Sequence, residues 1–366
     1  YSDENFYFIT VGETPGKRIT DVQSSSEPPF KTVTDYIDFQ YHEVNLVNFV
    51  KSGRKWFGEN FDDNPVLTLN FYYPNLNNEK AVKFGIYAAG RSTSNSKIFV
   101  TPAGSEVQEI SMPKILGQYQ YAKETESRLF YYTTDSDISF NLTYSKPDGG
   151  SNAWLDYFEV NAYRHLIMTN HQMAFNYDVL LETDKFFEFE LSGAHEGQMI
   201  WEVTNPYDVK NISDFEFNSG TLAFCLQLPR THYFVAFDEQ GFYVPQFVGQ
   251  VENQDLLGSN PFDIAIVTSE EFRQEALRLA NFHLEHDQLP TLVVTAEQIY
   301  NEFSSGKQDP TAIRNFLKYH YNTSGGEYPQ YLLLFGDASY DYKSVLPNNT
   351  NIVPVYQSIG STSLTD

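Results

Sequence analysis

The sequence predicts a multidomain protein in which an all-β, β-sandwich-like N-terminal region is followed by the first half of a doubly wound α/β domain. A chain of 366 residues can hold more than one domain, at roughly 100–200 residues each. Short runs of alternating apolar and polar residues recur up to about residue 258, separated by turn formers and without helical patterns between them. Beyond that point apolar strands alternate with helical patterns, which is typical of a parallel sheet.

Composition and charge exclude several classes of partner. The formal net charge of −24 would repel phosphate backbones and anionic headgroups, so we expect no nucleic-acid partner. Acidic residues are scattered, as at Glu124 and Glu126, which indicates a solvated surface. The single cysteine excludes an intrachain disulfide. No stretch approaches the roughly 20 apolar residues of a membrane-spanning helix, so no transmembrane segment is expected.

Residues 1–60 are predicted to form an N-terminal β segment. The apolar run 5–11 reads as a strand that Gly12 ends, and the polar stretch 23–29 reads as a loop. Residues 35–42 alternate ring and polar side chains, which is the pattern of a half-buried strand. The chain starts at Tyr1, so any targeting signal is not visible in it.

Two β-rich domains are expected to follow, over residues 61–165 and 166–258. In the first, strands are predicted at 66–72, 82–87, 130–132 and 138–144, and only sheet-on-sheet packing buries so many one-faced strands. In the second, the clearest strands are 186–191, 199–203 and 232–237. We therefore predict an antiparallel β-sandwich and then a second β-rich unit.

Residues 259–366 are predicted to be the incomplete first half of an α/β domain. Strands are expected at 262–268, 291–295 and 331–335, and helices after the first of these, at 296–303 and at 309–321. Ser269 is the predicted N-cap of the first helix, and Pro310 occupies a permitted first-turn position in the last. Near-continuous apolar strands indicate a parallel sheet that helices cover on both faces.

The best candidate site is the loop that follows the third of these strands. Ligands of open parallel sheets gather at the carboxyl ends of strands, and this strand ends in the run from Gly336 to Asp341. Gly336 permits a sharp turn, and Asp337 and Asp341 offer oxygen ligands or acceptors for backbone N–H groups. From the residues alone, an Asp337 that only caps the turn is the commoner outcome.

Other reactive residues give weaker signals. Cys225 lies seven residues before His232, but its apolar surroundings predict a core thiol and not a nucleophile. His283 and His286 can share one helix face, yet no third ligand lies near them in sequence, so we assign them no metal. No nucleotide-binding, zincin or serine-hydrolase motif occurs.

Several segments resemble the gingipain family of cysteine peptidases, and in particular the sortases of the type IX secretion system. The resemblance is carried by Tyr331–Tyr342, Ile352–Gln357 and Ser363–Asp366, and upstream by Lys51–Glu59, Val248–Leu256, Phe262–Ser269 and Glu275–Ala280. It covers most of the chain. It implies that the α/β part is half of a caspase-like domain whose catalytic His and Cys lie beyond Asp366, so no catalytic residue is expected within the chain.

The resemblance also implies a function and a cofactor. Such a sortase is a cell-surface, outer-membrane protein that removes the C-terminal signal domain of secreted cargo proteins and attaches the cargo to lipopolysaccharide. Outer-membrane subunits of the secretion system would be further partners. Asp337 would help to hold a structural calcium ion. The alternative is a non-enzymatic β-sandwich adhesion or glycan-binding module fused to a degenerate α/β domain.

Overall fold

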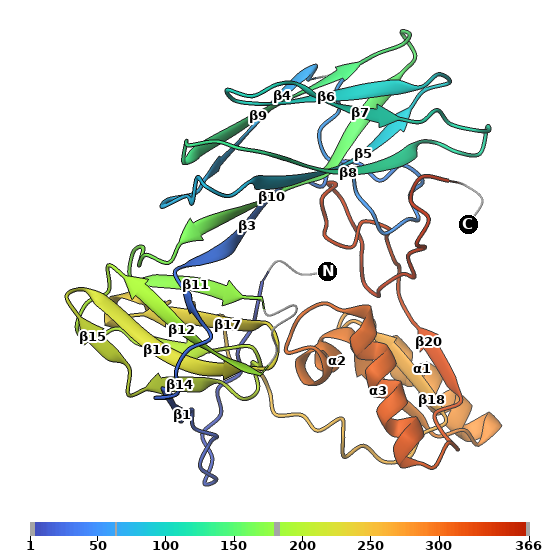
Figure 1. The fold of residues 1–366 in the computed structure, drawn as a ribbon. Coiled ribbons are helices and arrows are strands. Elements are labelled where there is room, and N and C mark those ends of the chain that lie inside the picture. The colour runs from blue at the N-terminus through green and yellow to red at the C-terminus, as the bar shows by residue number, and fades with distance from the viewer. Residues whose placement is uncertain (1–3, 63, 179–183, 364–366) are drawn as a thin grey trace.

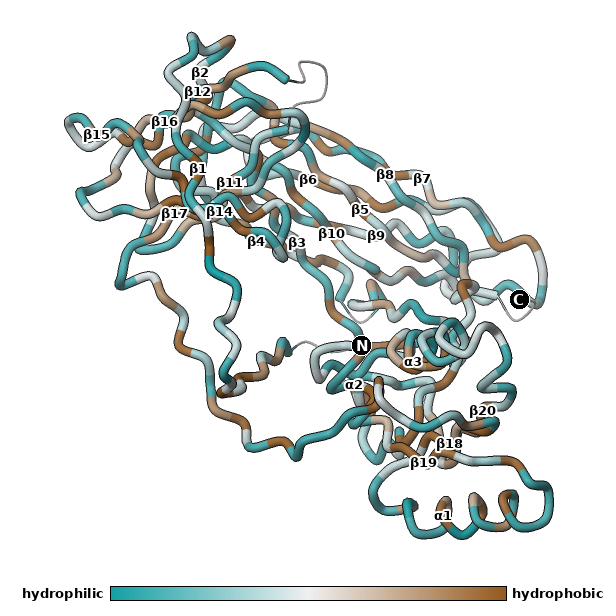
Figure 2. The backbone as a smooth tube through the Cα atoms, turned by 90° about the horizontal axis from the view of Figure 1, so that it is seen from below, coloured by the Kyte–Doolittle hydropathy of each residue, from teal (hydrophilic) through white to brown (hydrophobic). Residues whose placement is uncertain are grey.

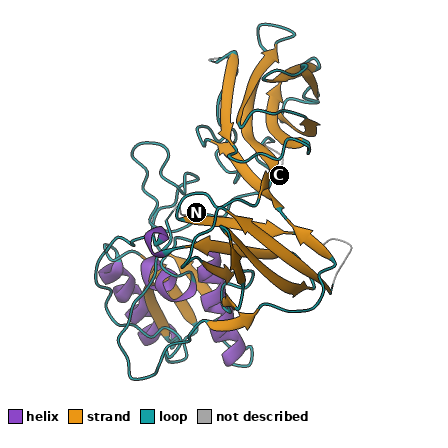
Figure 3. Cartoon of the chain, turned by 60° about the vertical axis from the view of Figure 1, so that its left-hand side comes forward, coloured by secondary structure: helices purple, strands orange, loops and turns teal. Residues whose placement is uncertain are grey.

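The computed structural model describes residues 4–62, 64–178 and 184–363, which form two β-sandwiches and one α/β unit (Figure 1). Helices gather in the α/β unit alone among these residues, and the two sandwiches consist of strands and loops (Figure 3). The predicted class, a sheet-rich N-terminal region followed by an α/β portion, is confirmed.

The first sandwich contains two four-stranded antiparallel sheets. The strands of one, in spatial order, are β3 (Asp35–Glu43), β10 (Asn152–His165), β5 (Val82–Arg91) and β8 (Lys123–Tyr131); those of the other are β4 (Val66–Tyr72), β9 (Asp137–Ser145), β6 (Ser96–Pro102) and β7 (Gln108–Met112). Alternate residues of each strand point inward, so rings such as Phe84, Phe140 and Phe158 meet between the sheets, with centroids 4.8–5.6 Å apart. Their packing makes this core predominantly aromatic.

The second sandwich has a five-stranded and a four-stranded sheet. The first contains β1 (Thr20–Gln23), β14 (Lys210–Ser213), β13 (Met199–Glu202), β17 (His232–Phe237) and β11 (Gln172–Tyr177); the second contains β15 (Glu216–Asn218), β16 (Thr221–Leu228), β12 (Lys185–Ser192) and β2 (Lys31–Val33). Phe189, Phe224 and Phe234 stack at its centre. A short 3-10 helix, η1 (Glu239–Gly241), follows β17.

The N-terminal segment divides its strands between the two sandwiches. β1 and β2 add to the second sandwich as parallel strands, whereas β3 pairs with β10 in the first. The predicted strand at 5–11 is wrong, because no neighbouring backbone pairs with this segment. Its rings pack instead against the turn after α2, where a Cβ on Gly306 would lie 3.3 Å from Phe6 Cβ and Phe8 Cζ. The four domain boundaries stay predictions.

The α/β unit is built around a three-stranded parallel sheet of order β19-β18-β20. β18 (Ile264–Thr268) pairs in parallel with β19 (Thr291–Thr295) on one side and β20 (Tyr331–Leu334) on the other. Helix α1 (Arg273–Phe282) and its π-helical continuation η2 (His283–Asp287) follow β18, and α2 (Ala296–Phe303) and α3 (Pro310–Thr323) follow β19. α1 packs on one face of β18, and α2 and α3 pack on the other, which confirms the doubly wound arrangement.

The ends of these helices test the sequence rules for capping. Thr295 forms a full capping box with Gln298 at the start of α2, and Asp309 caps α3 with Pro310 in its first turn, as predicted. The predicted N-cap at Ser269 is wrong, because α1 begins only at Arg273, with Phe272 at the cap position. A tight turn over 269–272 separates strand and helix, and it leaves the Ser269 hydroxyl buried and without a hydrogen-bond partner.

Strand β20 forms an edge of the sheet and is exposed along its whole length. Its side chains, from Tyr331 to Leu334, are nevertheless all apolar or aromatic, and Figure 2 shows apolar residues gathered on β18, β19 and β20. An exposed apolar edge strand offers unpaired backbone groups to a further strand. Among the described residues no helix is long and apolar enough to cross a membrane.

The two aromatic cores provide a test of whether the sandwiches unfold separately. We expect Phe158→Ala and Phe234→Ala each to destabilise one sandwich by about 3–5 kcal/mol, because each ring is fully buried among other rings. Differential scanning calorimetry should show each variant lowering a different transition. The exposed Tyr132→Ala is the control. If both core variants lowered the same single transition, the sandwiches would form one cooperative unit.

Candidate functional site

The candidate site lies where the parallel strands end. The carboxyl ends of β18, β19 and β20 meet at one edge of the sheet, and Gly336 and Asp337 follow β20 there, as predicted. The ladder continues one residue past β20, since Phe335 N donates to Val267 O at 2.8 Å and Thr268 Oγ1 donates to Phe335 O at 2.7 Å. The turn that carries the predicted site residue is therefore fixed to the central strand.

Gly336 is required by close packing at this turn. A Cβ built on Gly336 would lie 2.6 Å from Ile352 Cγ2, far inside van der Waals contact. The chain returns to the strand end over residues 350–353, because the Asp337 carbonyl accepts hydrogen bonds from the amides of Ile352 and Val353 at 3.0 and 3.1 Å. Any larger residue at 336 would push these two segments apart.

The Asp337 side chain acts as a local hydrogen-bond acceptor. Its Oδ1 accepts from the amide of Ala338 at 2.9 Å, and its Oδ2 accepts from Thr350 Oγ1 at 3.0 Å. These contacts tie residues 337–338 to residue 350, which is the turn-capping role that the residues alone favoured.

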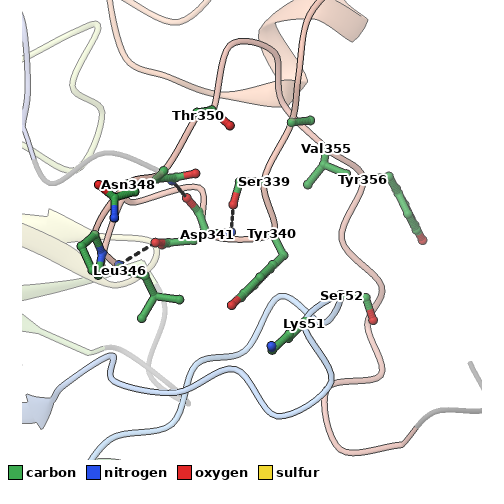
Figure 4. Close-up of a pocket in the computed structure, with 13 residues that line it drawn as sticks. Lys51, Ser52, Ser339, Tyr340, Asp341, Leu346, Asn348, Thr350, Val355 and Tyr356 are labelled. Atoms are coloured by element: carbon green, nitrogen blue, oxygen red, sulfur yellow. Dashed lines mark hydrogen bonds between the residues drawn. The ribbon is translucent and has the colours of Figure 1, made fainter.

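Asp341 organises the loop beyond the turn. It is 1% exposed, and its two carboxylate oxygens accept from the amides of Val345 and Leu346 at 2.9 and 2.6 Å (Figure 4). Its own amide donates to Ser339 Oγ at 3.1 Å. A buried carboxylate that accepts backbone N–H groups in this way holds the loop in one conformation.

The described residues do not assemble a calcium cage around Asp337. Calcium requires six to eight oxygen ligands as a rule, and within the described chain no group of three or more His, Cys, Asp or Glu side chains could hold a metal ion. The nearest sequence candidate, Asp341, directs its carboxylate at backbone amides. Calcium at Asp337 therefore stays a prediction.

A cavity of about 510 Å³ opens beside this loop, between the α/β unit and the first sandwich (Figure 4). Lys51 and Ser52 line one side, and residues 338–341, 346–350 and 355–356 line the other. A smaller cavity of about 210 Å³ lies at the ends of β18 and β19, beside the N-terminus of α2. Both cavities place polar groups at the sheet edge where ligands of parallel sheets bind.

The larger cavity exists because two distant segments are joined backbone to backbone. Gly53 pairs with Ser358 in a parallel bridge, Lys55 N donates to Ser361 Oγ at 3.0 Å, and Tyr121 N donates to Thr362 O at 2.8 Å. A Cβ on Gly53 would lie 2.5 Å from Ser361 Cα, so only glycine permits this approach.

These joined segments are the ones that carry the family resemblance. Trp56 stacks on Tyr340 with the ring centroids 5.9 Å apart and an angle of 16° between the planes. The structure thus brings Lys51–Glu59 against the segment that follows Tyr331. Of the resembling run Ser363–Asp366, residues 364–366 lie outside the described part of the chain.

A charged cluster that the sequence did not reveal supports this junction. Asp156 sits at the β-bulge of β10, is 9% exposed, and has its carboxylate 3.8 Å from Lys55 Nζ, which also pairs with Glu124. Burial raises the pKa of Asp156 to about 6, against the opposing effect of Lys55 and with reinforcement from Glu124 and Glu43. Residues separated by 32 to 101 positions carry no sequence signal of their contact.

The remaining sequence candidates are structural. Cys225 is buried, as predicted, and burial raises the pKa of its thiol, while His232 bonds to Glu202 at 3.2 Å. His283 bonds to Asp287 at 2.7 Å. The sequence missed a second cluster, in which Asp238 Oδ2 pairs with His171 Nδ1 at 2.8 Å and with His195 Nε2 at 2.9 Å.

Comparison with known proteins supports the same α/β assignment. Residues 258–366 match the model of Peptidase family C25. The fold is that of PorU: the chain superposes on the crystal structure of dimeric latent PorU from Porphyromonas gingivalis with a TM-score of 0.82 and 22% sequence identity, over 94% of this chain and 34% of that chain. The chain thus spans about one third of the PorU chain. No curated protein matches it by sequence.

A second solved structure is similar only locally. The carbohydrate-binding module CBM36 in complex with calcium and xylotriose aligns at a TM-score of 0.21 and 16% identity, over 26% of this chain and 71% of that chain. This value is too low to indicate a shared fold.

Replacing Gly336 tests the packing of the turn. We expect Gly336→Ala to destabilise the α/β unit by about 1–3 kcal/mol, because the new methyl group overlaps Ile352. Hydrogen exchange measured by mass spectrometry should be faster over residues 336–353. The matched control is Gly117→Ala, where no atom lies within 4 Å of the added Cβ. Equal exchange in the two variants would contradict the proposed constraint.

The raised pKa of Asp156 predicts a pH dependence. Because the folded value of about 6 exceeds the ordinary value of 3.8, the folded state binds the extra proton between them. This group therefore contributes its full stability below about pH 4, and the contribution is lost as the pH rises through about 6. Relative to Asp156→Asn, the wild-type protein should lose up to about 3 kcal/mol of unfolding free energy from pH 4 to 7.

Chemical denaturation at a series of pH values measures that difference. The exposed Asp137→Asn serves as the control, and its difference from wild type should not vary with pH in the same way. Parallel wild-type and Asp156→Asn curves would show that Asp156 ionises normally.

Proposed function

We propose that this chain is the N-terminal portion of a cell-surface cysteine peptidase of the gingipain kind, which acts as a secretion-system sortase. The observation that carries the proposal is the parallel sheet β19-β18-β20, which lies within the residues that match Peptidase family C25. The PorU-like fold of the whole chain supports it independently. The exposed apolar edge of β20 supports continuation of the sheet by a further strand.

In the proposed reaction a cysteine beyond residue 366 is the nucleophile. Its thiolate attacks the carbonyl carbon of the bond before the C-terminal signal domain of a cargo protein, and the amine of that domain leaves with a proton from the catalytic histidine. An amine of the lipopolysaccharide then attacks the thioester, forms an amide with the cargo and releases the thiol. The buried Cys225 has no part in this chemistry.

The β-sandwiches would hold the peptidase unit in position. Residues 51–57 contact the segment 358–361 through backbone hydrogen bonds, so the first sandwich fixes the chain where it leaves the α/β unit. The sandwiches would also provide contacts for cargo and for outer-membrane subunits of the secretion system. In this proposal the cavity beside Lys51 and Asp341 lies at the boundary between scaffold and peptidase.

Labelling of the longer protein tests the proposal. We expect a peptidyl chloromethyl ketone to alkylate one cysteine in a protein that extends beyond residue 366, and to label the Cys225→Ala variant equally. The chain 1–366 should not be labelled, because its thiol is 5% exposed and has a raised pKa.

Two results would contradict this function. Loss of labelling in Cys225→Ala would place the nucleophile in the second sandwich. A longer protein without any reactive cysteine would support the non-enzymatic binding module instead.

A further inference from the structure

One side of the β3-β10-β5-β8 sheet lacks a second layer over much of its length. Its inner side packs against the other sheet of the first sandwich (Figure 1). Its outer side is covered only at one end, where Phe57 and Phe49 lie over Ala89 and Trp154. The rest of this outer side is solvent-exposed in the described chain, and we call it the aromatic face.

Strand register fixes which residues share the aromatic face. Residues directly opposite each other on neighbouring strands point to the same side. In the order β3, β10, β5, β8, three successive rows therefore read Glu43, Tyr157, Tyr87, Glu126; Tyr41, Glu159, Gly85, Arg128; and Phe39, Asn161, Lys83, Phe130. Each row combines aromatic and hydrogen-bonding side chains.

The rings of the aromatic face present flat surfaces to solvent. Phe39 and Tyr41 are 50% and 61% exposed, and they stack on each other with a centroid distance of 5.8 Å. On the opposite edge strand Phe130 is 62% exposed. Exposed aromatic rings on a solvated sheet face are unfavourable unless they bind something. Between them Tyr87 and Tyr157 stack at 3.9 Å.

The centre of the aromatic face supplies hydrogen-bonding groups. Arg128 donates to the Tyr87 hydroxyl and lies 3.7 Å from Glu159, whose side chain occupies the space above Gly85. Asn161 and Lys83 make no side-chain hydrogen bond or ion pair with other described residues. Donors and acceptors thus lie between two sets of rings.

We propose that the aromatic face binds a neutral oligosaccharide. A pyranose ring has apolar C–H faces that pack on aromatic rings, and hydroxyls that need donors and acceptors at its rim. Charge favours a neutral ligand, because Lys83 and Arg128 offset the nearby carboxylates in a protein of net charge −24. A protein partner would instead desolvate Glu159 and Arg128 at the centre of its interface, which is costly.

The dimensions of the aromatic face agree with a short glycan. Three strand spacings separate β3 from β8 in the sheet. At about 4.8 Å per spacing the outer rings lie roughly 14 Å apart, close to the length of about three sugar units. This site is separate from the peptidase unit, so the inference does not depend on the proposed function.

Affinity electrophoresis tests the inference. The chain 1–366 is run in native gels that contain soluble mannan, dextran or galactan, and we expect at least one of these neutral polysaccharides to retard it. The double variant Phe39→Ser/Tyr41→Ser should bind more than about tenfold more weakly, because stacked aromatic residues dominate such contacts. The control Tyr72→Ser changes a ring of similar exposure on the other sheet, and its affinity should change less than about twofold.

Circular dichroism establishes that each variant is folded. Three outcomes overturn the inference: no retardation by any of the three polysaccharides, equal retardation of the double variant and wild type, or retardation only by the anionic probe dextran sulfate. Light scattering provides a further criterion. A dimer that the double variant dissociates, without polysaccharide binding, would show that the aromatic face binds a second copy of the chain.

Discussion

Burial of strand β18 between two helical layers is the constraint from which the α/β unit follows. All five residues of β18 are buried, with Ile264 and Ile266 facing α1 and Ala265 and Val267 facing α2 and α3. A strand buried on both faces requires neighbours on both sides, and parallel neighbours require helical crossovers. The strand ends are thereby brought together, and Gly336 and Asp337 are placed at the only edge where a loop can contact all of them.

The second constraint is the close backbone contact between Gly53 and Ser358. It joins segments more than 300 positions apart, and it makes the first sandwich part of the site without contributing a strand to the parallel sheet. The stacking of Trp56 on Tyr340 and the buried Asp156 beside Lys55 stabilise the same contact. Sandwich and α/β unit therefore share one functional region.

The first sandwich has two functions in this description, and they use different sides of one sheet. The inner side forms an aromatic core that needs no partner beyond the opposite sheet. The outer side supports the segment 46–57 at one end and presents exposed rings at the other. The β-bulge between Leu155 and Tyr157 marks the boundary between these parts, because it places Asp156 at their junction.

The sequence by itself determined which segments form strands and helices, since alternation and capping depend on neighbouring residues. β4, β17, β19 and α2 have the predicted bounds, and Asp309 and Pro310 begin α3 as predicted. Residues 5–11 have the strand pattern but form no strand, because a strand also needs a paired backbone.

Only the tertiary structure decided which distant residues meet. Ser269 does not cap α1, because the path from β18 imposes a turn before the helix. The pairing of Asp238 with His171 and His195 and the approach of Asp156 to Lys55 depend on strand order and on a bulge, which have no local signature in sequence. For the same physical reason the position of Asp337 was predictable from its strand, whereas the partners of its carboxylate were not.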